Sequence, residues 1–307
     1  MNEILPYNPL AEISEIFSWK TAVNPCWSAE ERIVLRDDPS LSITYSYAIG
    51  SDTRLADFYA FSETNLGIPV RIPMWSSPHF HPGVVLSTDI SISLTDSLLH
   101  YLLSPGDEVI LWKSATSYRS LVVNTISSNS ISFTTPIGAG FYAFYLLPLL
   151  TGRFNKEVNF TKGAGSRKRA NLIFEVLSIH IPGSTDSLDK VLQSTDFSTM
   201  SAQDREIVSS ALGIYENLPT SSLVKSSWKC SFTLSSPTTY IGFLHFLNYI
   251  QGRANSFLFP YNYLSPAIYP YTPTVFSSSD SITLNHSYPR RCSSSLELEG
   301  TIIVGGN

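Results

Sequence analysis

The sequence predicts a mainly β protein of two β-sandwich or barrel-like domains, each with a short helix, related by internal duplication. Two observations favour this fold class. Residues 41–75 and 226–261 share one pattern, in which an alternating strand, an amphipathic helix, a glycine and an aromatic strand follow one another. Residues 84–133 contain short strands separated by turn signals, which is typical of a small barrel or sandwich.

The first copy of the pattern begins with Leu41–Tyr47, where apolar and polar residues alternate as in a strand with one buried face. Apolar residues then recur at helical spacing between Leu55 and Phe61. Gly67 ends this helix, and Val70–Trp75 is the predicted closing strand.

The second copy repeats this order. Trp228–Leu234 alternates apolar and polar residues, and Phe243–Ile250 has helical spacing. Gly252 ends the helix, and Phe257–Pro260 is the predicted closing strand. Because both copies place the same residue types in the same order, we expect them to be related.

Upstream of the first copy, Glu31–Arg36 reads as a strand. Asp37–Ser40 reads as a turn, since Asp and Pro favour turn geometry. We therefore expect residues 31–36 and 41–49 to pair as a hairpin.

The first domain is expected over residues 1–165, with a barrel-like insertion at about 84–154. Pro105–Asp107 is a turn that opens this series. The strands predicted after it are Glu108–Trp112, Arg119–Ile126, Ile131–Phe133 and residues 141–154.

The second domain is expected over residues 166–307, starting with the β-rich run Ala170–Ile181. The polar residues of about 184–219 predict a helical or loop insertion, with one helix that starts at a capping box of Ser201 and Asp204. Tyr261–Pro273 predicts an extended arm or loop, because frequent proline blocks both helices and central strands.

Composition favours a protein that is covered by partners. The charged fraction is 15%, below the roughly 25% of ordinary domains, while aromatic residues reach 12%. Interface cores are poor in charge and rich in aromatics, although β-rich domains also favour aromatic residues. The net charge of −5 argues against nucleic-acid binding.

No signal-peptide pattern and no apolar run of about 20 residues is found, so we expect no export and no membrane span. The three cysteines share no motif spacing, which argues against a disulfide framework or a zinc site. His79 and His81 lie on one face of an extended segment, either as the start of a metal site or as loop histidines at an interface. No catalytic or phosphate-binding motif is present, so the sequence predicts neither an enzyme nor a cofactor.

Several segments resemble virion proteins of tailed bacteriophages. Ser18–Val23, followed by Glu31–Arg36 and Pro39, is similar to an opening in which a Trp-Thr-Val segment precedes a Glu-(Gln/Arg)-Arg strand and a proline turn. Gly106–Trp112 and the strands after it resemble the small β-barrel of these proteins. In the second half, Gly252-Arg253 leading to Phe257–Pro260 is similar to their Gly-Arg and Phe-Pro segment.

The resemblance implies a tail-tip or baseplate component of the distal-tail or tail-hub type. Such a protein would form a ring of its own copies, as a trimer or a hexamer, and would contact the tail tube, the hub and the tape measure. It would be made in the cytoplasm of the bacterial host and reside in the virion. One hub type carries an iron–sulfur cluster on four cysteines, which the three scattered cysteines here cannot supply.

The alternative is a carbohydrate-binding β-sandwich module, which requires aromatic platforms on its surface. Under either hypothesis, aromatic residues are the candidate anchors of a core or an interface. They are Trp19, Trp75, Trp112, Trp228, Phe257, Phe259, Tyr261, Tyr263, Tyr269 and Tyr271.

Overall fold

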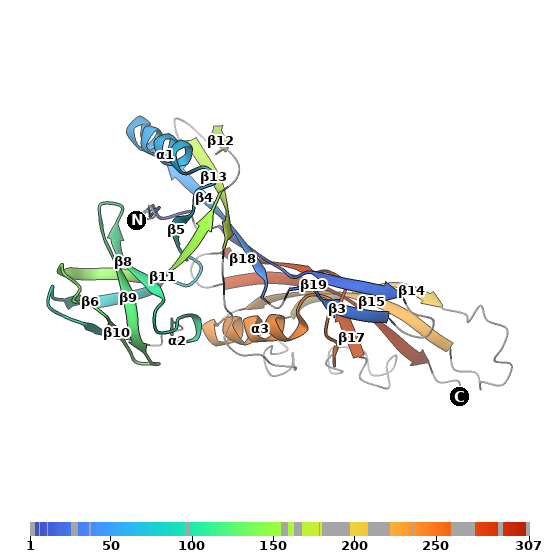
Figure 1. Ribbon diagram of the computed structural model, residues 1–307. Coiled ribbons are helices and arrows are strands. Elements are labelled where there is room, and N and C mark those ends of the chain that lie inside the picture. The colour runs from blue at the N-terminus through green and yellow to red at the C-terminus, as the bar shows by residue number, and fades with distance from the viewer. Residues whose placement is uncertain are drawn as a thin grey trace. The chain divides into compact units, whose positions relative to one another are not determined.

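The computed structural model describes residues 4–5, 7–10, 12–25, 30–36, 38–95, 99–154, 159–162, 168–177, 179, 197–207, 222–234, 236–258, 274–287 and 291–304 (Figure 1). It confirms the predicted mainly β fold, with antiparallel pairing throughout its long strands. No helix among the described residues is long and apolar enough to cross a membrane.

The chain divides into two compact units. Unit 1 comprises Met1–Ile16, Ser40–Pro182 and Asn285–Arg291, and unit 2 comprises Phe17–Pro39, Gly183–Leu284 and Cys292–Asn307. The expected boundary between residues 165 and 166 does not coincide with this division. Residues 168–176 belong to unit 1, because strand β13 pairs there with β4 along its whole length.

Unit 1 contains a sheet in which β5, β11, β13, β4 and β1 lie side by side in this order. One helix, α1, follows β4, and its Phe58 ring packs against Tyr47 of that strand. The bounds are β1 Ile13–Ser18, β4 Ser40–Ile49, α1 Asp52–Asn65, β5 Val70–Pro73, β11 Phe141–Arg153, β12 Asn159–Lys162, which pairs with β13, and β13 Lys168–Val176.

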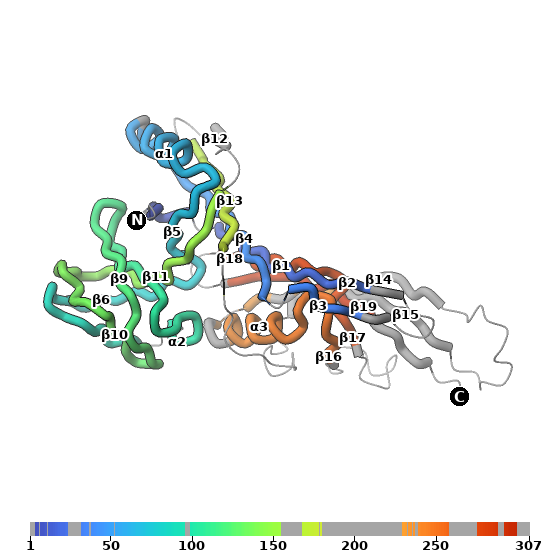
Figure 2. Tube along the Cα trace, in the orientation of Figure 1, coloured from blue at the N-terminus to red at the C-terminus, as the bar shows by residue number. Residues whose placement is uncertain are grey.

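A barrel-like sheet is inserted between β5 and β11, in the order β7, β10, β9, β8, β11, β6. Apolar side chains from all six strands and from α2 form one core. Figure 2 follows β11 from this sheet into the sheet that it shares with β5, so that one strand belongs to both. The remaining bounds are β6 His79–Val85, β7 Ser91–Ser93, α2 Leu99–Leu102, β8 Glu108–Ser114, β9 Ser117–Ile126 and β10 Ser130–Phe133.

Unit 2 also contains a five-stranded sheet, in the order β16, β17, β19, β15, β14. Helix α3 follows β15, and a separate two-stranded hairpin is formed by β2 and β3. The bounds are β2 Thr21–Pro25, β3 Glu30–Val34, β14 Phe197–Ile207, β15 Ser222–Leu234, α3 Pro237–Ile250, β16 Phe257–Leu258, β17 Thr274–Ser277, β18 Ser281–Ser287 and β19 Arg291–Val304.

The two sheets have the same topology. In each, a strand is followed by a helix of 14 residues and a strand at the opposite end of the sheet. Both helices begin at a serine N-cap, Ser51 or Ser236, whose side chain accepts a hydrogen bond from a backbone N–H of the first turn. The internal duplication itself stays a prediction.

Two predicted elements are wrong. Strand β3 does not pair with β4 as a hairpin, because it pairs with β2 from Val34↔Thr21 to Glu30↔Pro25. The capping box at Ser201 does not start a helix, since residues 197–207 form strand β14 and pair with β15. Local helix signals are weak compared with a long ladder of backbone hydrogen bonds. The rest of the predicted insertion lies outside the described residues.

Candidate interaction surface

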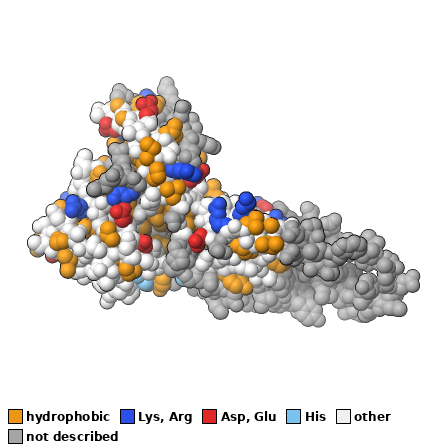
Figure 3. Space-filling model, viewed as in Figure 1, with side chains coloured by type: hydrophobic (Ala, Val, Ile, Leu, Met, Phe, Trp, Pro, Cys, Tyr) orange, Lys and Arg blue, Asp and Glu red, His pale blue; other side chains and the backbone are white. Residues whose placement is uncertain are grey.

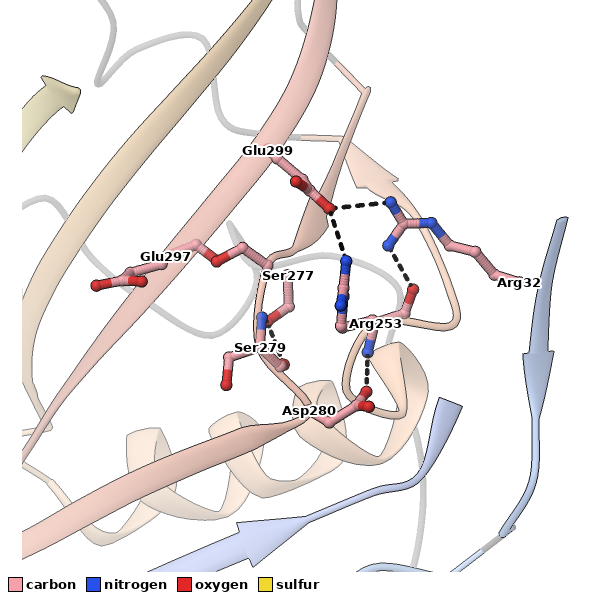
Figure 4. Close-up of polar contacts among 8 residues, drawn as sticks. Arg32, Arg253, Ser277, Ser279, Asp280, Glu297 and Glu299 are labelled. Atoms are coloured by element: carbon pink, nitrogen blue, oxygen red, sulfur yellow. Dashed lines mark hydrogen bonds and ion pairs between the residues drawn. The ribbon is translucent and has the colours of Figure 1, made fainter. Parts of the chain in front are cut away.

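The first candidate site is a cluster of charged side chains in unit 2 (Figure 4). Arg32 on β3 donates to Glu299 on β19 at 3.0 Å and to the backbone carbonyl of Arg253 at 2.9 Å. Arg253 also reaches the same carboxylate, at 3.5 Å. The Arg32 guanidinium lies 3.9 Å from the ring centroid of Phe276, and its side chain is only 5% exposed.

A backbone turn beside this cluster is held by Asp280. Its carboxylate accepts from the backbone N–H of Arg253 at 3.1 Å and of Thr21 at 3.3 Å. Gly252 has a φ of +68°, and a Cβ atom there would lie 2.7 Å from Asp280 Oδ1 and 3.1 Å from Trp19 Cβ. Only glycine fits this turn without a backbone shift.

These contacts assign the cluster a structural role. One carboxylate is shared by two guanidinium groups, and the partially buried charges are paired within the fold. The cluster joins Arg32 to Gly252-Arg253, two segments that carry the resemblance to virion proteins although they are far apart in sequence. The cluster therefore links the β2–β3 hairpin to strand β19 of the unit 2 sheet, and this link is the structural role of Arg32 and Arg253.

The second candidate site is a fully buried carboxylate in unit 1. Glu15 accepts hydrogen bonds from the Ser76 hydroxyl and from His286 Nε2, the latter at 2.8 Å. A nucleophilic serine needs a base beside it, as in a Ser–His–acid chain. Here the carboxylate lies between the serine and the histidine, so the order is unsuited to that chemistry, and the contacts tie β1, β18 and the segment after β5 together.

The two histidines of the sequence analysis lie on the same face of β6, as predicted, opposite the exposed residues of that strand. His79 is buried, whereas His81 is half-buried and packs against Phe144, with 5.1 Å between ring centroids. Burial lowers the pKa of His81. Among the described residues, no group of three or more His, Cys, Asp or Glu side chains could hold a metal ion.

Most of the described aromatic candidates are core residues. Trp112 is buried and stands edge-to-face with half-buried Trp75, with 4.9 Å between ring centroids. Trp19 and Phe257 are also buried. The side chain of Trp228 and the residues Phe259, Tyr261, Tyr263, Tyr269 and Tyr271 lie outside what the structure describes.

The third candidate site was missed in the sequence. Every second residue of β6, continuing past its end, turns an apolar side chain outward, and Tyr142 on β11 lies directly across from Val84. Exposure reaches 65% for Val84, 60% for Tyr142, 59% for Leu86 and 45% for Phe80. We call this set the β6 stripe, which comprises Phe80, Pro82, Val84, Leu86 and Tyr142.

The β6 stripe carries no charge. Neither β6 nor β11 contains Asp, Glu, Lys or Arg before Arg153. Figure 3 shows hydrophobic side chains among uncharged ones on the face of unit 1 that it presents, with acidic and basic groups at several points. Contiguous exposed apolar surface of this kind marks binding sites in soluble proteins.

A strained backbone lies under the stripe. The register of β6 and β11 shifts between Tyr142↔Val84 and Phe144↔His81, and Ala143 at this irregularity has a φ of +50°. A residue with a Cβ atom rarely adopts that conformation. Strain of this type is concentrated at functional sites, which supports the stripe as the candidate interaction surface.

Comparison with known proteins adds no relative: no protein-family model and no curated protein matches this chain.

Proposed function

We propose that this protein is a structural virion component of a phage tail tip or baseplate, which forms a ring linking the tail tube to the hub and the receptor-binding parts. The observation that carries the proposal is the β6 stripe, an exposed and uncharged apolar face. Burying such a face against another chain is favourable at roughly 25 cal/mol per Å² of apolar area. A protein whose work is assembly needs surfaces of this kind.

The shared topology of the two sheets supports the same proposal. If the units arose by duplication, one chain carries two similar sheets and can present two similar surfaces to its neighbours. A ring of such chains then offers twice as many similar surfaces as it has subunits. This would ease a change of symmetry along a tail.

The resemblance in sequence is the link to phages. Its segments around Arg32 and Gly252-Arg253 meet in the charged cluster of unit 2, and Gly106–Trp112 leads into the barrel-like sheet. These residues therefore have defined roles in the fold, as family motifs should. The proposed partners are other copies of the chain, the tail tube, the hub and the tape measure, with residence in the virion.

Negative-stain images of the purified protein, alone and with its tube or hub partners, test the proposal. Rings are expected. Images with no ring under either condition would end it. Glycan binding by an isolated monomer would instead favour the carbohydrate-binding module.

A further inference from the structure

We infer that residues 4–5 and 7–10, which we call the arm, bind unit 1 of a neighbouring copy in the assembled protein, at the surface where the structure shows the arm of the same chain. This inference rests on the proposed function, because both require the chain to assemble with copies of itself. It goes further by naming the contact between two chains: the arm of one and the arm-binding surface of the next.

One end of the arm covers an apolar cluster of unit 1. Ile4 is buried in this cluster, and the other buried members that the structure describes lie on strands β8 and β11. Trp75 and Tyr145 pack against the same cluster. Without Ile4, part of this apolar surface would be exposed to water, which is unfavourable. The four strand residues are Ile110, Trp112, Leu147 and Leu149.

The backbone of the arm lies along strand β5, which is at the end of the unit 1 sheet. Ile4 forms a parallel bridge with Arg71, and the Leu5 N–H donates to the Arg71 carbonyl at 3.1 Å. Leu5 itself is fully buried. Adding an extended segment to the edge of a sheet is a common mode of peptide recognition.

The rest of the arm is held by α1 and β4. Tyr7 stacks on Phe58, with 4.7 Å between ring centroids, and the Arg54 guanidinium lies 5.0 Å from the centroid of the Tyr7 ring. The Leu10 N–H donates to the Ser46 carbonyl at 2.6 Å. The surface therefore recognises an extended segment with an apolar pair at one end and a tyrosine in the middle. This chain carries that segment, so a second copy is an occupant that fits.

The arm is attached to the sheet less firmly than a strand is. Among the described residues, its one bridge to a strand is that between Ile4 and Arg71, whereas β13 pairs with β4 along its whole length. Segments with few backbone hydrogen bonds open at a lower free energy than core strands. The arm of a neighbour makes the same contacts as the arm of the same chain, so exchanging arms retains them and is a low-cost route to assembly.

Symmetry links the exchange of arms to a ring. A ring requires a head-to-tail contact between two different patches, and the arm and the arm-binding surface are two such patches. An open row of chains leaves one arm and one arm-binding surface unfilled at its ends. A closed ring fills all of them, so exchange favours closure.

The test is disulfide trapping in the full chain. Ile4→Cys and Arg71→Cys are combined in one chain, because these two residues are bridge partners. Neighbouring strands lie about 4.8 Å apart, within the Cα separation that a disulfide tolerates. After oxidation, most of the double variant should run on a non-reducing gel as a ladder of multiples of 34.0 kDa, which disappears on reduction. The wild type, which has three cysteines, gives the background.

The matched control combines Asn8→Cys with Arg71→Cys. Asn8 is exposed and belongs to the same arm, so this variant measures bonds that form by random collision, and no ladder is expected. Counting free thiols in the Ile4→Cys and Arg71→Cys variant detects a bond within one chain, since such a bond removes two thiols without a ladder. Bonds confined to single chains, or no bond at all, would overturn the exchange.

Tyr7→Ala gives a second readout that needs no new cysteine. Sedimentation velocity should show self-association weakened at least about tenfold, because an aromatic anchor of the contact is lost. Tyr59→Ala, at an exposed residue of α1, should associate like the wild type. Tyr7 is half-buried, so its variant should fold, and thermal unfolding checks this. If Tyr7→Ala associates as well as the wild type, the arm is not the contact.

Negative-stain images of the wild type decide the proposed function separately. Rings together with bonds confined to single chains would retain the proposed function and reject the exchange of arms. A ladder without rings would do the reverse.

Discussion

Gly67 and Gly252 occupy equivalent positions in the two units. Each lies two residues beyond a helix of 14 residues, and each has a left-handed φ, of +73° and +68°. Their surroundings differ, because a Cβ atom at Gly67 would meet nothing within 4 Å, whereas one at Gly252 would collide with Asp280. The two glycines therefore share a left-handed backbone, whereas only Gly252 has neighbours that a Cβ atom would meet.

Gly67→Ala should therefore lower the free energy of unfolding by about 1 kcal/mol, because alanine adopts the left-handed conformation less readily than glycine and meets no steric clash there. Gly252→Ala should cost about 2–4 kcal/mol, because the collision with Asp280 is added to the same conformational term. Chemical denaturation of both variants measures the difference. Equal losses would show that the turn around Asp280 adapts freely.

Glu299→Gln should destabilise the protein by about 2–4 kcal/mol, because it removes the negative charge of the carboxylate that the Arg32 and Arg253 guanidinium groups share. The matched control is Glu297→Gln, on the same strand, whose partner Lys229 is exposed. That change should cost less than about 1 kcal/mol. Similar losses in the two variants would contradict the structural role given to the charged cluster.

Ala143→Gly should stabilise the protein by about 0.5–1 kcal/mol, because glycine adopts a φ of +50° without strain. The same change at Ala48, which lies near the end of β4 and pairs with Arg169 of β13, should destabilise it by a similar amount, since glycine there gains only freedom in the unfolded state. Urea unfolding of the two variants checks the opposite signs. If Ala143→Gly is destabilising as well, the irregularity at β6 and β11 is not strained.

Burial raises the pKa of the Cys230 thiol to about 12. The folded state therefore resists ionisation that the unfolded state permits. The stability contributed by this thiol is present below the ordinary thiol pKa and is lost as the pH rises from there to about 12. Cys230→Ala should show a shallower loss of stability than the wild type over this range, by up to about 1.4 kcal/mol per pH unit. If the unfolding free energies of the wild type and of Cys230→Ala fall in parallel over this pH range, the expectation is wrong.

Local signals explain what the sequence predicted well. Ser51 and Gly67 mark the ends of α1, and Ser236 and Gly252 mark those of α3, so both helices fall where the apolar spacing placed them. Strands with one buried face, such as β4, were readable from alternation.

Contacts between distant segments explain the failures. Strand β14 replaced a predicted helix because it forms a long antiparallel ladder with β15, the next strand along the chain, and this ladder outweighs a local capping signal. The contact of Glu15 with His286 and that of Arg32 with Glu299 join opposite ends of the chain, where no spacing rule applies. Alternation in β6 predicts one apolar face, but only the fold reveals that this face points outward while Val85 points into the core.

Sedimentation equilibrium of the purified full chain over a wide concentration range tests the central claim most directly. The claim is that this chain assembles with other copies of itself. The account predicts a mass that is a defined multiple of 34.0 kDa and is stable in high salt, since the contact proposed is apolar. A single species of 34.0 kDa at every concentration would contradict it.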